Sequence, residues 1–212
     1  MTNAHYHRGD ATLMSVRGIE HRFWGVHPWA AEGVNVEDVV GRVREAVRTD
    51  AAAGVGEIGL DRLRTRSVTP SQRQLFEAQL RVAAELRRPV VLHGAKCWGD
   101  VVKTVRPFVP AIPSFLFHGF SRSGGLIPEI VELNGFVSVG KAVLNDHAVN
   151  YRKLVAQIPH DRLLVETDDD AEPPARDSLL AAIGAKTAEL TGITEAELEA
   201  NADAFLQTIK AS

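Results

Sequence analysis

The chain has 212 residues, of which 45% are hydrophobic, and its 24 Lys and Arg residues face 27 Asp and Glu residues. This length supports one sizeable core and argues against a second full domain, so we expect residues 1–212 to form a single domain. A formal net charge of −3 excludes the basic surplus typical of sequence-independent nucleic-acid binding, so any phosphate recognition has to be local.

The sequence also excludes several cellular contexts. Cys97 is the only cysteine, which rules out an intramolecular disulfide and fits a reducing compartment. The N-terminus shows no signal-peptide pattern, and no apolar run is long enough to cross a bilayer. We therefore expect a soluble, cytoplasmic protein with no membrane contact and no evident obligate protein partner.

The N-terminal part begins with short β-like stretches. Residues 12–16 have β character, and residues 22–27 read as a strand that ends in a turn. Asn35 can cap a helix, because the valines at positions 36, 39, 40, 43 and 47 recur at helical spacing.

Strands and helices then alternate to the end of the chain. Thr69 and Pro70 open a helix that Pro89 stops, and Gln72 would complete a capping box. The expected strands are 51–58, 89–93, 115–118, 135–139 and 162–167, and the further helices are 99–106, 126–134, 148–157 and two that begin near residues 177 and 194. Six clear strands with two doubtful ones near the N-terminus favour a mostly parallel α/β fold, a TIM-like (β/α) barrel, over an open sheet.

Metal-ligand side chains recur at the expected C-terminal ends of these strands. In a barrel such ends converge on one mouth, where the active sites of this fold lie. Each residue alone has an ordinary interpretation as a core histidine, a turn aspartate or half of an ion pair, but their conjunction on five strands is typical of a metal centre. Imidazoles and carboxylates together suit ions such as zinc or manganese. The six residues are His5, His7, Glu57, His93, His118 and Asp168.

Motifs along almost the whole chain resemble those of the TatD family of metal-dependent deoxyribonucleases, within the amidohydrolase-like barrel hydrolases. The matching motifs are His5-x-His7, Gly-Val-His-Pro-Trp at 25–29, Gly-Glu-Ile-Gly-Leu-Asp at 56–61, the glutamines at 74 and 79, Pro-Val-Val-Leu-His at 89–93, His-Gly-Phe-Ser at 118–121, Asp-Arg-Leu-Leu-Val-Glu-Thr-Asp at 161–168 and Asn-Ala-Asp-Ala-Phe at 201–205.

The resemblance implies two divalent metal ions, which could be Zn, Mn or Mg. His5, His7 and Asp168 would hold one ion, His93 and His118 the other, and Glu57 would bridge them. Two ions can together cleave a phosphodiester, and Asp168 is then the expected general base, with Glu57 as the second catalytic residue.

The chain departs from the family pattern in three places. Asn3 stands where an Asp is usual, and Asp169-Asp170 follows Asp168 where Ala-Pro is more common. The stretch between His7 and His27 is also much shorter than in typical members. We therefore expect the first βα unit to be shortened or missing.

Further residues near the expected mouth are candidates for substrate binding. His27 precedes a proline at a strand end, Lys96 follows His93 by three residues, and Arg62 opens an arginine cluster with Arg64 and Arg66. Each could meet a phosphate, although a solvated loop cation or a structural turn histidine explains each equally simply. The tryptophans at 24, 29 and 98 could stack on bases, with core packing favoured for the first.

The leading hypothesis is a two-metal phosphodiesterase or deoxyribonuclease acting on nucleic acid or a nucleotide. One alternative is an amide or ester hydrolase, because the same barrel and ligands support that chemistry. Another is a catalytically silent barrel that binds a nucleotide or a partner. Local positive charge at the mouth distinguishes the first two hypotheses, because a phosphodiester needs it and an amide does not. Metal content of the purified protein distinguishes the silent barrel from both enzymes.

Overall fold

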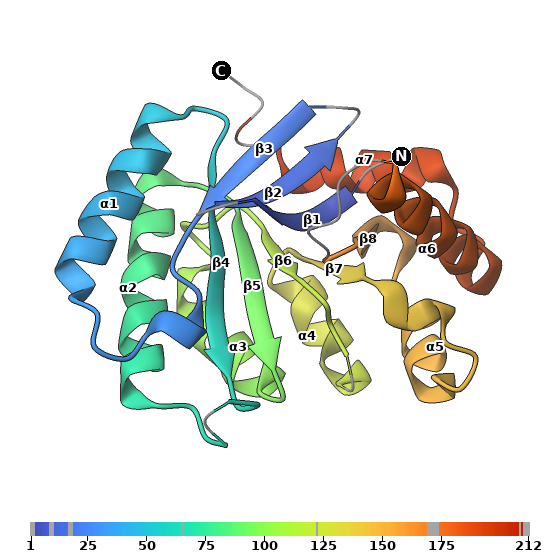
Figure 1. Ribbon diagram of the computed structural model, residues 1–212, viewed down its shortest axis with the longest axis horizontal. Coiled ribbons are helices and arrows are strands. Elements are labelled where there is room, and N and C mark those ends of the chain that lie inside the picture. The colour runs from blue at the N-terminus through green and yellow to red at the C-terminus, as the bar shows by residue number, and fades with distance from the viewer. Residues whose placement is uncertain are drawn as a thin grey trace.

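The structure is a computed structural model that describes residues 3–8, 11–16, 19–64, 66–121, 123–168, 174–207 and 209, with the backbone alone for residues 3–8 and 11. One curled sheet of eight strands, ordered as in the chain, forms its centre (Figure 1). The strands are β1 (Asn3–Arg8), β2 (Ala11–Val16), β3 (Ile19–Trp24), β4 (Gly54–Asp61), β5 (Val90–Ala95), β6 (Phe115–Phe117), β7 (Gly135–Val139) and β8 (Leu163–Val165).

Helices cover the outside of this sheet (Figure 1). The sheet curls so far that its first strand, β1, contacts its last strand, β8. The helices are α1 (Val36–Thr49), α2 (Pro70–Leu86), α3 (Trp98–Val105), α4 (Ile127–Glu132), α5 (Val149–Val155), α6 (Ala175–Thr191) and α7 (Glu195–Phe205). The expected TIM-like barrel is confirmed. None of the helices in the described part of the chain is both long enough and apolar enough to span a membrane.

The first βα unit differs from the others, as the sequence predicts. Strands β3 to β8 pair in parallel, but β2 is antiparallel to both β1 and β3. A helical crossover between parallel strands needs about a dozen residues or more, and only residues 9–18 separate β1 from β3. Strand β2 therefore takes the place of the first helix and connects β1 to β3.

The predicted helix starts are also confirmed. The side chain of Asn35 accepts hydrogen bonds from the backbone N–H groups of Glu37 and Asp38, and the buried face of α1 consists of Val39, Val43 and Val47. The hydroxyl of Thr69 accepts from the backbone N–H of Gln72 at 3.2 Å and caps α2. The expected capping box is not formed at this helix, and the Gln72 side-chain oxygen instead accepts from the backbone N–H of Asp61 at 3.1 Å.

Alternation along the strands produces an apolar barrel floor below a polar mouth. Val91, Leu116, Phe136 and Leu164 point inward and pack with Phe205 of α7, whereas their strand neighbours pack against the outer helices. Because side chains two residues apart on a strand share a face, the residues that follow this inner layer by two positions also face inward. These residues are His93, His118, Ser138 and Glu166.

Candidate metal centre

Glu57 occupies the interior of a strand, which corrects the sequence-based expectation that it stands at a strand end. Strand β4 continues to Asp61, three residues beyond the predicted end, and its pairing register with β5 shifts between Val55 and Ile58. Such irregularities re-aim side chains next to functional sites. Gly59, with φ of +155°, lets β5 approach closely, since a Cβ there would lie 2.0 Å from the His93 carbonyl oxygen.

Three imidazoles surround the buried carboxylate of Glu57. Its Oε1 atom lies 2.7 Å from Nδ1 of His93, 3.3 Å from Nε2 of His118 and 3.8 Å from Nε2 of His27. Burial of one carboxylate among imidazoles is typical of a site built for a cation. Ligand atoms of His27, Glu57 and His93 all lie within 4.8 Å of one another.

The other predicted ligands are placed to different degrees. Asp168 follows β8 in a left-handed conformation with φ of +46°, and its Oδ2 lies 3.9 Å from Nε2 of His118. Its side chain is 47% exposed, so it faces the mouth. His5 and His7 lie on β1, next to β8, but their side chains fall outside the described residues.

Two buried carboxylates hold the imidazoles from behind, a role that the sequence analysis did not assign. Oδ2 of Asp61 lies 3.0 Å from Nε2 of His93, and Oε2 of Glu166 lies 3.1 Å from Nδ1 of His118. Glu166 also accepts a hydrogen bond from the hydroxyl of Ser138. Carboxylates of this kind fix the ring orientation of metal-binding histidines. Their positions four residues after Glu57 and two before Asp168 were the available sequence signals.

These contacts set the electrostatics of both carboxylate–imidazole pairs. Burial by itself would lower the pKa of His118, but the Glu166 and Glu57 carboxylates outweigh it and raise this pKa to about 10. Burial by itself would raise the pKa of Asp61, but hydrogen bonds from Trp29, His93 and the backbone N–H groups of Arg64 and Leu63 bring it below its ordinary value. The Glu166 and Glu57 carboxylates thus favour the cationic form of the His118 ring.

His27 lies closer to the centre than its expected substrate-side role requires, and it is a further candidate ligand. Gln79 of α2 positions the loop that carries it, because the Gln79 amide accepts from the Val26 N–H at 2.7 Å and donates to the Val26 carbonyl at 3.1 Å. The Trp29 indole N–H donates to Asp61 at 2.7 Å, and the Arg64 guanidinium lies 4.3 Å from the centroid of the indole ring.

The three tryptophans have different environments. Trp29 is 54% exposed at the rim, whereas Trp98 is buried and packs against Phe117 and Phe120. Trp24 is partly buried against the core, as the sequence analysis favoured. Trp29 is therefore the most exposed of the three tryptophans.

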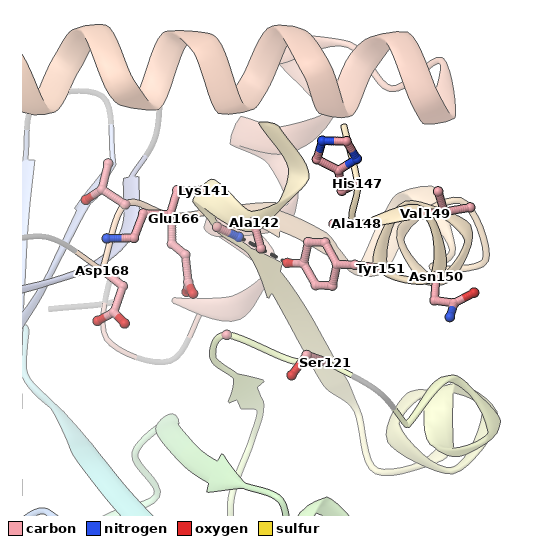
Figure 2. Close-up of a pocket in the computed structure, with 13 residues that line it drawn as sticks. Ser121, Lys141, Ala142, His147, Ala148, Val149, Asn150, Tyr151, Glu166 and Asp168 are labelled. Carbon is pink, nitrogen blue, oxygen red and sulfur yellow. Dashed lines mark hydrogen bonds between the residues drawn. The ribbon is translucent and has the colours of Figure 1, made fainter. Parts of the chain in front are cut away.

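Two cavities open beside the centre and share Gly119, Ser121 and Asp168. The Lys96 cavity, of about 860 Å³, is lined by Arg62, Lys96, His93 and His118 among others, so both predicted cations reach the mouth. Arg62 also forms an ion pair with Asp100 at 2.8 Å. The Tyr151 cavity, of about 820 Å³, lies on the other side of Asp168 and is lined by Lys141, Asn150 and Tyr151 among others (Figure 2).

Comparison with known proteins shows which family this chain resembles along most of its length. The family model described as "TatD related DNase" matches residues 11–209. A relative from Dickeya dadantii (strain 3937), named 3'-5' ssDNA/RNA exonuclease TatD, is 32% identical over 145 residues, 68% of this chain and 54% of the relative. The uncharacterized metal-dependent hydrolase YabD from Bacillus subtilis (strain 168) is 29% identical over 144 residues, 68% of this chain and 56% of the relative.

A solved structure gives the same result at the level of the fold. The crystal structure of YJJV, a TatD homologue from Escherichia coli K12, superposes with a TM-score of 0.72 and 26% identity. The match covers 88% of this chain and 73% of that chain. The matched region spans about half the length of the two curated relatives.

Proposed function

The chain belongs to the TatD family of related DNases, and from this premise we propose that it is a metal-dependent phosphodiesterase acting on nucleic acid or a nucleotide. The observation that carries the proposal is the buried Glu57 carboxylate, whose Oε1 lies within 3.8 Å of three imidazoles. The single sheet and its two apolar clusters support the further proposal that residues 1–212 act as one domain.

The donor set fits divalent cations. Imidazole nitrogens with carboxylate oxygens suit zinc and manganese better than magnesium, which prefers oxygen ligands. We propose that Glu57 is shared between two ions, with His93 and His118 on one, His5, His7 and Asp168 on the other, and His27 as a further donor. When bound, such ions polarise a phosphodiester and stabilise the charge that develops on its leaving oxygen.

The remaining roles belong to side chains of this chain. Asp168 lies where the two cavities meet and is half-exposed, so we propose that it accepts a proton from the attacking water. Asp61 and Glu166 keep the His93 and His118 rings in place. Lys96 and Arg62 supply positive charge to the phosphates of the substrate from the Lys96 cavity.

Two observations support a phosphodiester over an amide or a carboxylic ester. Each cavity has at least one cationic side chain in its wall, Lys96 and Arg62 in one and Lys141 in the other. The relative from Dickeya dadantii is named an exonuclease for single-stranded DNA and RNA. An amide or a neutral ester has no phosphate charge for these side chains to bind.

A substrate screen tests the proposal. The protein, loaded in turn with zinc, manganese or magnesium, is assayed on single-stranded DNA, RNA, methyl 4-nitrophenyl phosphate, a 4-nitrophenyl carboxylic ester and an anilide. We expect the protein to cleave the phosphodiesters in a metal-dependent way, and a chelator to abolish this cleavage. Glu57→Ala should lower the cleavage rate at least a hundredfold, since the shared ligand is lost. Cleavage confined to the ester or the anilide would refute the proposal.

A further inference from the structure

We propose that the Tyr151 cavity is the subsite for one nucleoside, the base and sugar on one side of the scissile phosphate; this inference rests on the proposed function. The cavity is lined by residues from four places at the mouth: Ser121 after β6, Lys141 and Ala142 after β7, the segment from His147 to Tyr151, and Glu166 to Asp168 after β8 (Figure 2). Glu166 and Asp168 belong to the centre described above, whereas the segment from His147 to Tyr151 has no role in the ligand set or the mechanism proposed above.

The position of the cavity sets what can enter it. A phosphodiester carries one group on each side of its phosphorus atom, and the phosphate has to lie at Glu57, His93 and His118 for cleavage. From there a substrate can extend into two cavities, which meet at Asp168 and Ser121. The Lys96 cavity, with two cations, suits the phosphates of a continuing chain, which leaves the Tyr151 cavity for the group on the other side.

The walls of the Tyr151 cavity suit a nucleoside. Ala142, Ala148 and Val149 provide apolar surface for the face of a base, and the amide of Asn150 can both donate to and accept from its edge. Figure 2 shows Glu166 and Asp168 on one side of the cavity and Val149 and Asn150 on the other. Among the described lining residues, this cavity has one lysine, Lys141, whereas the Lys96 cavity has both Arg62 and Lys96.

The size and construction of the cavity support one nucleoside. Its volume of about 820 Å³ lies within the usual range for small-molecule sites. Arg152 of α5 ties the wall together, because its guanidinium donates to the Val143 carbonyl at 3.0 Å and to Asp146 at 2.7 Å. Tyr151 accepts a hydrogen bond from the Gly140 N–H at 3.3 Å, which joins α5 to the end of β7. A wall held in this way is already formed for its ligand.

A matched pair of variants at the two ends of α5 tests the proposal. Ala148→Phe fills part of the cavity, and Ala156→Phe makes the same change at an exposed position that lines neither described cavity. The metal-loaded proteins are assayed on a single-stranded oligonucleotide, on oligonucleotides with an abasic residue at either end, and on methyl 4-nitrophenyl phosphate. Binding of dAMP and dTMP to each protein is followed by NMR shifts of Ser121 and Asn150.

We expect Ala148→Phe to lower kcat/KM on the intact oligonucleotide at least tenfold more than on the small phosphodiester, and Ala156→Phe to change neither. Removal of one terminal base should lower wild-type kcat/KM at least tenfold and have little effect on Ala148→Phe, because both changes remove the same contact between the base and the cavity. Equal losses on both substrates, or independent effects of base and variant, would overturn the inference.

Nucleotide binding separates this inference from the proposed function. If no phosphodiester is cleaved but dAMP or dTMP shifts Ser121 and Asn150 in wild type and not in Ala148→Phe, the subsite stands and the nuclease assignment fails. If phosphodiesters are cleaved while the nucleotides leave these residues unshifted and Ala148→Phe behaves as wild type, the nuclease assignment stands and the subsite is wrong.

Discussion

Asp61→Asn is the substitution whose consequences the structure specifies most fully. Oδ1 of Asp61 accepts from the backbone N–H groups of Leu63 at 2.5 Å and Arg64 at 3.1 Å. Its Oδ2 accepts from the Trp29 indole at 2.7 Å and lies 3.0 Å from Nε2 of His93. An asparagine has the same shape but only one acceptor oxygen, so in either orientation its NH₂ group faces N–H donors.

The magnitude follows from this mismatch. A buried donor left without its acceptor costs about 1–3 kcal/mol; the hydrogen bonds to Asp61 are partly buried, so we expect Asp61→Asn to lower the free energy of unfolding by an amount near the lower end of this range. His93 itself is unchanged in this variant, but its imidazole ring loses the carboxylate that fixes its orientation. Loss of such a partner typically weakens metal binding by about 10–100-fold. Unfolding and metal binding should therefore both weaken, although Asp61 is not a proposed ligand.

Urea unfolding of the metal-free protein and calorimetric titration with zinc measure the two effects separately. Asp146→Asn is the matched control, since Asp146 pairs with Arg152 at an exposed position and should leave both quantities near wild type. If Asp61→Asn binds zinc with wild-type affinity, Asp61 does not hold His93 for the metal. A variant as stable as wild type would also refute the donor–acceptor argument.

Three further outcomes are expected. Asp168→Asn should lower kcat by about two orders of magnitude with a modest loss of metal affinity, and kcat within a few-fold of wild type would exclude Asp168 as the base. Lys96→Met should raise KM on a polynucleotide and reduce the slope of log K against log salt by about 1, with a smaller effect for Arg62→Met because Arg62 pairs with Asp100. Equal effects on methyl 4-nitrophenyl phosphate would remove the role of Lys96 in binding a polymer. Burial raises the pKa of the Cys97 thiol to about 11, so only about one thousandth is thiolate at pH 8, and DTNB should label the native thiol far more slowly than the urea-unfolded one.

The regular part of the fold could be predicted because its signals are local. The spacing of Val39, Val43 and Val47 and the caps at Asn35 and Thr69 fixed α1 and α2 within a residue or two at their starts. The orientation of β2 was not predictable in this way. Residues 12–16 indicate a strand, but antiparallel pairing on both sides follows from the short connections and from neighbouring strands.

The centre was predictable only as far as residue type and strand position allow. His93 and His118 share the inward face with Val91 and Leu116, two residues earlier, and this period can be counted in the sequence. The hydrogen bonds of Asp61 and Glu166 could not be predicted, since each partner comes from another strand and depends on how neighbouring strands align. The proximity of His27 to Glu57 likewise depends on Gln79, which holds the loop from α2.

The assignment of all six ligands stays a prediction, as does the number of ions. For His5, His7 and Asp168 it depends on side chains of β1 that lie outside the described residues, and on a carboxylate 3.9 Å from His118. The position of β1 beside β8 is compatible with it.

Metal content per chain, with and without Glu57, tests the central claim most directly. After loading with zinc or manganese and removal of free metal, elemental analysis should find two equivalents in wild type, and fewer than one in Glu57→Ala, because the carboxylate shared by both ions is missing. Glu85→Ala, which removes an exposed carboxylate paired with Arg44, should retain two equivalents. Circular dichroism establishes that each variant is folded. Two equivalents retained by folded Glu57→Ala, or no metal in wild type, would contradict a metal centre built on Glu57.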